Sequence, residues 1–222
     1  MRVRLTYRTC VLGGCSIAIA VATLFATRAG LTPLLWIAVA AFAVSVAFVL
    51  AIATKVLFGV ESFSFLHYQI AAIVATAVIA RDALNLLALT LAIAQAFGRI
   101  GCANAGCCHG RGRFPLQRVE SALLFAIAAI CAMRIDRAFV IYTLAYAATR
   151  FALEYLRGDR RRSFRGVSEA QWICIATSIA MIAVDLAAIP VAAVLIVATI
   201  VRFEIELRVA TARRLDFIGG AK

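Results

Sequence analysis

Long apolar runs, each ending at a few charged or turn-forming residues, most constrain what this chain can fold into. They cover about residues 10–27, 33–57, 66–80, 84–97, 118–133, 137–156 and 170–201. The chain is 64% hydrophobic, whereas soluble domains are roughly 45–50% apolar. A bilayer offers the backbone no water to bond, so each spanning run has to be helical. The sequence therefore predicts an all-α, polytopic membrane bundle with about seven transmembrane helices.

The last apolar run decides the number of spans. Residues 170–201 are long enough for one helix kinked at Pro190 or for two short helices, so eight spans are the alternative. Residues 202–222 alternate apolar and charged side chains, and we expect this tail to lie at the membrane surface. Because the chain has no internal repeat or linker, residues 1–222 are expected to form a single integral membrane domain.

The formal net charge is +12, almost all of it from arginine. Basic residues beside membrane spans usually set topology and bind anionic lipid headgroups. Nucleic acid is not an expected partner, because the chain has no soluble basic domain. With seven spans, the N-terminus and the segments 98–117 and 157–169 share one side. The positive-inside rule, taken alone, places that arginine-rich side in the cytoplasm.

Residues 98–120 place four arginines, three cysteines and a histidine between two apolar runs. Charges near hydrocarbon are costly, so clustered arginines there usually serve a ligand or a partner. Arg113 and Arg118 fit a simpler role, in which their side chains reach the lipid headgroups. Arg99 follows the 84–97 run directly, and we predict that it is buried. A guanidinium held in this way can bind a phosphate with two hydrogen bonds.

A second polar group follows helical spacing in the 137–156 run. Steps of four and three residues put its members on one face of an otherwise apolar helix. A single Arg–Glu pair within a membrane would serve only helix packing, whereas a full polar stripe favours a polar cavity. The stripe consists of Tyr142, Tyr146, Arg150, Glu154 and Arg157.

The cysteines and histidines leave several interpretations open. Cys102, Cys107, Cys108 and His109 could ligate zinc, form a redox pair, or simply pack in a glycine-rich turn, which is the favoured interpretation. Adjacent cysteines are awkward for tetrahedral chelation. His67 lies among polar residues at the start of a short apolar run, so it could be a general base or a structural histidine.

Residues 98–120 resemble the signature of the bacterial prolipoprotein diacylglyceryl transferase family. The family pattern is Gly-Arg-Ile/Leu-Gly-Asn-Phe-x-Asn-Gly-Glu-x-x-Gly-Arg, followed by His-Pro-Ser-Gln-Leu-Tyr-Glu. The matching positions are Gly98, Arg99, Ile100, Gly101, Gly106, Gly110, Arg111, Pro115, Gln117 and Glu120. A later family motif, Tyr-x-x-x-Arg-Phe-x-x-Glu-x-x-Arg-x-x-Asp, is similar to Tyr146, Arg150, Phe151, Glu154, Arg157 and Asp159, with the aspartate one place early.

The chain departs from the family pattern at several positions. The two family asparagines fall at Cys102 and Ala105, and the family glutamate falls at Cys107. The insertion between the two signature parts is cut to two residues, and ungapped alignment places Leu66, not His67, at the family histidine. The arginines of the pattern are kept at Arg99 and Arg111, so these departures affect the prediction of the acceptor substrate more than that of phosphate binding.

The resemblance implies transfer of a diacylglyceryl group from phosphatidylglycerol to a lipoprotein cysteine thiol, with release of glycerol phosphate. It implies no cofactor and no metal. The expected catalytic residues are Arg99, Arg150, His67 and Glu120. The expected substrate-binding residues are Gly101, Cys102, Gly106, Gly110, Arg111, Gln117, Tyr146, Glu154 and Arg157.

The expected partners are phosphatidylglycerol or another anionic phospholipid, an acceptor peptide or protein, and the membrane. The family resemblance implies the bacterial inner membrane with the site toward the periplasm, against the positive-inside count. Two other classes stay open. One is a lipid- or anion-binding protein or transporter without catalysis, and the other is a membrane redox or metal protein centred on the Cys102–Cys108 loop.

Overall fold

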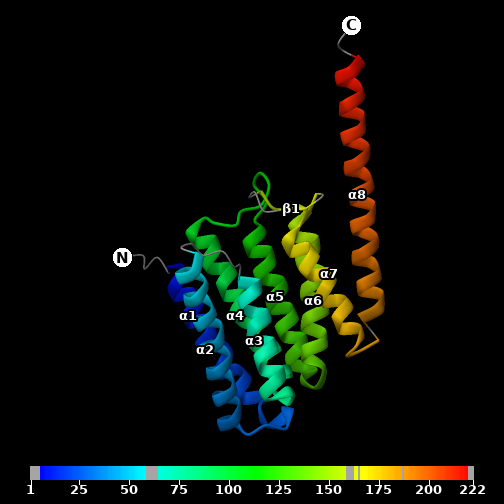
Figure 1. Cartoon of the computed structure of the whole chain (residues 1–222). Coiled ribbons are helices and arrows are strands. Elements are labelled where there is room, and N and C mark those ends of the chain that lie inside the picture. The colour runs from blue at the N-terminus through cyan, green and yellow to red at the C-terminus, as the bar shows by residue number, and fades with distance from the viewer. Residues whose placement is uncertain (1–5, 59–64, 159–162, 165, 187, 220–222) are drawn as a thin grey trace.

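The computed structural model describes residues 6–58, 65–158, 163–164, 166–186 and 188–219, with the side chains of 58, 65–67, 164 and 204–219 outside that description. Within these ranges the chain forms eight α-helices and one short hairpin (Figure 1). The helices are α1 (Tyr7–Phe25), α2 (Pro33–Phe58), α3 (Phe65–Ile79), α4 (Leu84–Ala105), α5 (Leu116–Met133), α6 (Ala138–Glu154), α7 (Glu169–Ile182) and α8 (Ala188–Gly219). The antiparallel strands are β1 (Ser163–Phe164) and β2 (Val167–Ser168).

The predicted all-α membrane bundle is confirmed, and the last apolar run forms the two helices of the eight-span alternative. The split falls after Ile182, where the amide of Asp185 still bonds the carbonyl of Met181 and α8 begins at Ala188. Among the described residues, four stretches are long and apolar enough to cross a bilayer: Tyr7–Phe25, Pro33–Leu57, Arg81–Ala105 and Leu116–Met133. The number of helices that actually cross stays a prediction.

Successive helices run in opposite directions, and this fixes which connections meet. The start of α1, the α4–α5 loop, the hairpin and the end of α8 all lie at one end of the bundle (Figure 1). Short 3-10 turns at Thr27–Ala29, Arg81–Ala83 and Ile135–Arg137 make connections at the other end. The start of α1 and the described parts of the segments 98–117 and 157–169 thus share one end of the bundle, and their side of a membrane stays a prediction.

The sequence suggested that residues 98–105 belong to a break between two helices. The structure shows that they are part of a helix. Helix α4 continues to Ala105 and α5 begins at Leu116, so the loop is 106–115. Helix α4 runs through Gly98 and Gly101, and α1 packs closely against Gly101. A Cβ atom at Gly101 would lie 3.0 Å from Cys10 Cβ and 3.1 Å from Tyr7 Cδ2. Small residues allow membrane helices to approach one another in this way.

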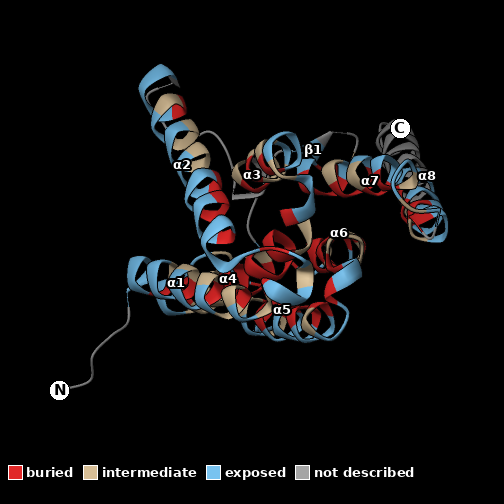
Figure 2. Cartoon of the chain, turned by 90° about the horizontal axis from the view of Figure 1, so that it is seen from below, coloured by how far each residue is buried: buried red, intermediate tan, exposed pale blue. Residues whose placement is uncertain are grey.

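Helix α4 is the centre of the bundle. It contacts α1, α5, α6 and α3, and 72% of its most apolar segment is buried, against 22% for α2 (Figure 2). The outer faces of α2 and α8 carry exposed apolar side chains, including Phe48, Val56, Val194 and Ile200. In a membrane protein such faces meet lipid tails, so they need no protein partner.

Helices α7 and α8 cover α6 rather than α4. Phe151 of α6 packs in one cluster with Cys174 and Ile175 of α7 and Leu195 of α8. Beyond these contacts α8 continues as a helix to Gly219 and projects past the ends of the other helices (Figure 1). Residues 202–219 therefore extend α8, and the position of the 202–222 tail at a membrane surface stays a prediction.

The closest approach of α1 and α4 gives a test of this packing. A Cβ atom at Gly14 would overlap Phe97 Cβ, whereas a Cβ atom at Gly13 would have no atom within 4 Å. We expect Gly14→Ala to lower the free energy of unfolding by about 1–3 kcal/mol through overpacking. Gly13→Ala should be neutral or stabilise by up to about 1 kcal/mol, since alanine is the better helix former. Thermal unfolding in detergent measures both, and equal melting temperatures would contradict the packing.

Candidate functional site

A polar cavity of about 60 Å³ lies between α1, α4 and α6, toward the end of the bundle that holds the α4–α5 loop. Three polar side chains come from the last turns of α4 and from α6: Gln95, Arg99 and Tyr146. The remaining lining residues are Tyr7, Val11, Cys15, Ala94, Gly98 and Cys102. No atom lies within 4 Å of where a Gly98 Cβ would stand, so this glycine leaves room beside Arg99.

An apolar cavity of about 160 Å³ adjoins the polar one, because Cys15 and Ala94 line both. It lies between α1, α2, α3 and α4, and its walls are made almost entirely of alanine and branched aliphatic side chains. Its polar members are few and include Tyr68, Gln69 and Thr90. The two cavities together offer a charged compartment beside an apolar one.

Two buried glutamines join the cavities, and the sequence analysis did not identify them as site residues. Gln95 of α4 donates its amide to the side-chain oxygen of Gln69 in α3, and Gln69 donates to the Tyr142 hydroxyl at 2.6 Å. All three side chains are buried. An amide within the apolar 84–97 run is costly unless it is hydrogen-bonded, and this was the signal that could have drawn attention to Gln95.

Arg99 forms an ion pair with Glu120 of α5, with 2.8 Å between Nη2 and Oε1. The glutamate side chain is 3% exposed and the arginine side chain 18% exposed. Arg99 therefore keeps part of its guanidinium at the cavity while Glu120 fixes its position. One residue further along α5, the Ser121 hydroxyl donates to the carbonyl of Ala96 at 2.9 Å, so α4 and α5 are joined twice.

The carboxylate of Glu154 forms ion pairs with two arginines. Its Oε2 lies 2.9 Å from Arg150 Nη2, one helical turn earlier, and 3.9 Å from Arg157 Nε. The three residues are buried, with exposed fractions of 9% or less. In the described part of the chain, Arg150 Nη1 is buried without a hydrogen-bond partner. An orphaned guanidinium N–H in a dry site is a donor available to an anion.

The polar stripe of α6 reaches the cavity through Tyr146. The Tyr142 and Tyr146 rings stack with centroids 5.7 Å apart and planes 2° from parallel. Tyr146 lies within electrostatic range of Glu120, Arg150 and Arg99, so it links the two ion-paired groups. Of the five stripe residues, Tyr146 lines the polar cavity, and the other four are buried but are not among its lining residues.

The α4–α5 loop is bound to the end of α6 through its backbone. The amide of Arg111 donates to the carbonyl of Leu156 at 2.8 Å, and that of Gly158 donates to the carbonyl of His109 at 3.0 Å. Gly110 and Gly158 permit this approach, since a Cβ atom at Gly158 would lie 2.7 Å from the carbonyl oxygen of Gly110. The Arg111 Nε donates to the carbonyl of Arg157 at 3.1 Å, so this arginine binds backbone rather than the cavity.

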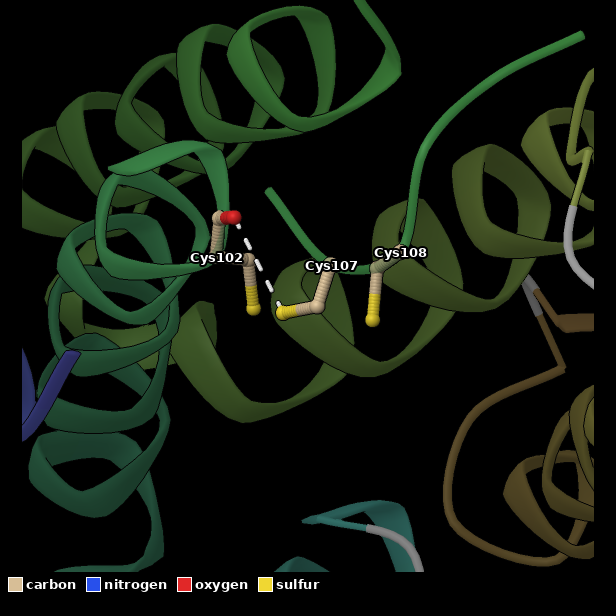
Figure 3. A group of neighbouring side chains, drawn as sticks. All are labelled: Cys102, Cys107 and Cys108. Atoms are coloured by element: carbon tan, nitrogen blue, oxygen red, sulfur yellow. Dashed lines mark hydrogen bonds between the residues drawn. The ribbon is translucent and has the colours of Figure 1, made fainter. Parts of the chain in front are cut away.

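Three of the four residues in the predicted cysteine–histidine group come together (Figure 3). The sulfur atoms of Cys102, Cys107 and Cys108 lie within 4.8 Å of one another, whereas His109 is outside the group. A hydrogen bond from the Cys102 thiol and the guanidinium of Arg157 hold the pKa of the Cys108 thiol well below its usual range, although burial opposes the shift. Gln117 donates its amide to the carbonyl of Cys107 at 2.7 Å, which holds the turn.

The other expected site residues have less direct roles. Gly101 forms the contact with α1, and Gly106, with a φ of +71°, ends α4. His67 belongs to α3 by its backbone, but its side chain lies outside the described residues, so the structure does not relate it to the cavity.

Glu154→Gln tests the buried arginine cluster. The amide keeps the shape of the side chain but leaves Arg150 and Arg157 without their shared carboxylate. Breaking a buried ion pair costs about 3–5 kcal/mol, so we expect a large fall in melting temperature. The control is Glu169→Gln, an exposed glutamate in the first turn of α7, with an expected loss below about 1 kcal/mol. Equal losses in thermal unfolding would contradict a buried role for Glu154.

Comparison with known proteins points to one family. A family model described as prolipoprotein diacylglyceryl transferase matches residues 64–187. The phosphatidylglycerol–prolipoprotein diacylglyceryl transferase of Clostridium tetani (strain Massachusetts / E88) is 32% identical over 122 residues, covering 43% of this chain and 49% of that protein. The phosphatidylglycerol–prolipoprotein diacylglyceryl transferase 2 of Clostridium perfringens (strain 13 / Type A) is 31% identical over 111 residues, covering 38% and 43%. The chain spans about half the length of the curated relatives it matches. No solved structure matches.

Proposed function

The chain belongs to the prolipoprotein diacylglyceryl transferase family, and from this premise we propose that it transfers the diacylglyceryl group of phosphatidylglycerol to the cysteine thiol of a prolipoprotein. Glycerol phosphate is the other product. The relatives named above carry both substrates in their names. The observation that carries the proposal is the arginine-lined polar cavity directly beside an apolar cavity.

The reaction forms one carbon–sulfur bond and breaks one carbon–oxygen bond. The acceptor thiol loses its proton to a base, and the sulfur attacks the glycerol carbon that bears the phosphate ester. The ester oxygen leaves with the bonding electron pair as glycerol phosphate. Negative charge therefore grows on the phosphate during the reaction, and a fixed cation in a dry site lowers the energy of that transition state.

Arg99 and Arg150 are the residues that we propose to bind this phosphate. Arg99 lines the polar cavity and is held by Glu120. Arg150 is buried beside Tyr146 and has an unused Nη1 donor. Because both guanidiniums are already positioned by carboxylates, little reorganisation is needed as charge develops. Glu120 and Glu154 act here as positioning residues, and Tyr146 orients the headgroup.

The apolar cavity suits the acyl chains of the donor lipid. Its walls come from α1 to α4, and the outer face of α2 is exposed to the surroundings with apolar side chains. A phospholipid could thus enter from the bilayer with the first part of its chains in the apolar cavity and its phosphate at Arg99. The Gln95–Gln69 pair lies where the glycerol ester groups would be placed.

The base and the orientation are proposed on sequence grounds. His67 is the candidate base, because its unperturbed pKa lies near neutrality. We place the protein in the bacterial inner membrane with the arginine-rich end toward the periplasm, where a secreted acceptor would meet it. The proposed site is completed by residues of α4, of the α4–α5 loop, of the start of α5 and of the end of α6. They are Gly101, Cys102, Gly106, Gly110, Arg111, Gln117 and Arg157. The loop residues contribute by holding the wall of the site in place.

Release of glycerol phosphate from labelled phosphatidylglycerol tests the proposal. Purified protein is assayed with and without a cysteine peptide that carries a lipoprotein acceptor sequence. We expect peptide-stimulated release that falls at least about 100-fold in Arg99→Ala and Arg150→Ala, because each removes a charge contact worth about 2.7 kcal/mol or more in the transition state. Arg113→Ala is the control, since Arg113 lies on the exposed part of the loop, and it should keep full activity.

Other outcomes separate the alternatives. Arginine-dependent release without peptide stimulation would keep the chemistry and assign another acceptor. No release under conditions where a relative is active, with labelled lipid or anion still bound or moved in proteoliposomes, would favour binding or transport without catalysis. Activity lost on replacing Cys107 or Cys108 but kept in Arg150→Ala would favour the redox or metal class.

A further inference from the structure

We propose that Cys102, Cys107 and Cys108 form a binding site for a thiophilic d10 cation, Zn²⁺ or Cu⁺, held by three thiolates. This site is distinct from the phosphate-binding role of the arginines and does not rest on the proposed transferase activity. Three sulfur atoms within 4.8 Å of one another are the observation that carries it (Figure 3).

The end of α4 explains why two of these side chains meet. The amide of Gly106 bonds the carbonyl of Ala103 and the amide of Cys107 bonds the carbonyl of Cys102, the hydrogen-bond pair of a Schellman motif. In that motif the residue just past the cap, here Cys107, packs against the third residue from the helix end, here Cys102. The contact is usually between apolar side chains. In this chain it brings two sulfurs together.

Cys108 completes the group through an unusual backbone conformation. Its φ is +56°, and it is the one non-glycine residue with positive φ in the described part of the chain. This conformation is uncommon for residues with a side chain, and strained backbone clusters at functional sites. It lets the third sulfur point to the same side as the other two instead of continuing away from the helix end.

The distances suit a small cation. With zinc–sulfur bonds of about 2.3 Å, three thiolates at a tetrahedral centre lie about 3.8 Å apart. Sulfurs at most 4.8 Å apart therefore need to close by about 1 Å or less. Side-chain rotation of Cys107 supplies such a movement, because that residue is exposed. Thiolate ligands select zinc and Cu⁺ over magnesium or calcium.

Surroundings and access also fit. The side-chain amide of Gln117 donates a hydrogen bond to the carbonyl oxygen of Cys107, with 2.7 Å between the two atoms. Such outer contacts hold metal ligands in place. The exposed Cys107 gives an entry path from solvent, and the buried Cys102 gives the site a dry side. Arg157 and Arg99 lie within electrostatic range of Cys108, so the net negative charge of three thiolates with one cation is offset nearby. Cys102 also lines the polar cavity, so a bound cation would join the cavity wall to the loop.

Metal titration of the reduced full-length chain in detergent tests the site. Zn²⁺ is titrated in competition with a chromophoric chelator, Cu⁺ is titrated in parallel, and Cd²⁺ reports the number of thiolates by its sulfur-to-metal charge-transfer absorption. We expect one ion per chain and a cadmium signal of three thiolates. Tighter binding of Cu⁺ than of Zn²⁺ would support the site with copper as its ion, and the reverse order would support zinc.

Single substitutions make the test specific. Cys107→Ser should weaken binding at least about tenfold, since even outer contacts of metal ligands contribute 10–100-fold. Because Cys107 is exposed, this variant keeps the packing of α4 even if Cys102→Ser does not fold. Cys131→Ser is the control, because Cys131 lies in α5, where its thiol bonds the carbonyl of Ala138. No stoichiometric binding, or equal affinity in Cys107→Ser and the unaltered chain, would overturn the proposal.

Discussion

Buried arginines in a membrane protein must meet carboxylates, and this requirement organises the centre of the molecule. Arg99 of α4 forms an ion pair with Glu120 of α5, while Arg150 and Arg157 both pair with Glu154 at the end of α6. Three guanidiniums thus face two carboxylates, and Arg150 keeps a buried N–H group that no described residue uses. Removing either carboxylate would leave a charge without a partner at a cost of several kcal/mol. The same pairs that hold α4 and α5 together and order the end of α6 also fix the cations that we propose to bind a phosphate.

The glycines and small residues of α4 make this arrangement possible. Gly14 of α1 packs against Phe97, and Gly101 packs against Cys10 of α1. Helix α1 therefore forms one side of the polar cavity, and α6 forms another. The apolar cavity lies next to it, and Gln95 and Gln69 meet at the boundary. In the proposed reaction a lipid would place its charged group and its chains in compartments of matching polarity. The α4–α5 loop is bound to the end of α6 by backbone hydrogen bonds and carries two of the three converging thiols, while Cys102 comes from the end of α4.

The apolar runs predicted the helices well, since burial in lipid requires continuous hydrophobic segments and the runs end where charges begin. They failed at residues 98–105, because the glycines that suggest a break serve other purposes here: Gly101 is a contact point with α1, and Gly98 leaves room beside Arg99. The i,i+4 spacing predicted the shared face of Arg150 and Glu154. The pairing of Arg99 with Glu120, by contrast, depends on how α4 and α5 pack, which local spacing does not contain. The amide of Gln95 in an apolar run was a local signal, but its pairing with Gln69 depends on how α3 and α4 pack. The meeting of three cysteines without His109 depends on the cap geometry of α4 and on the φ of Cys108.

The central claim is that phosphatidylglycerol lies with its phosphate at the buried arginines and its chains in the adjoining apolar cavity. The most direct measurement is photocrosslinking with a phosphatidylglycerol analogue that carries a photoactivatable group on an acyl chain, followed by mass spectrometry of the labelled peptides. The account predicts labelling of cavity residues such as Ala43, Ala72 and Leu87, suppressed by excess unlabelled phosphatidylglycerol and lost in Arg99→Ala. Labelling confined to the outer faces of α2 and α8, unchanged by competitor or by the loss of Arg99, would contradict it.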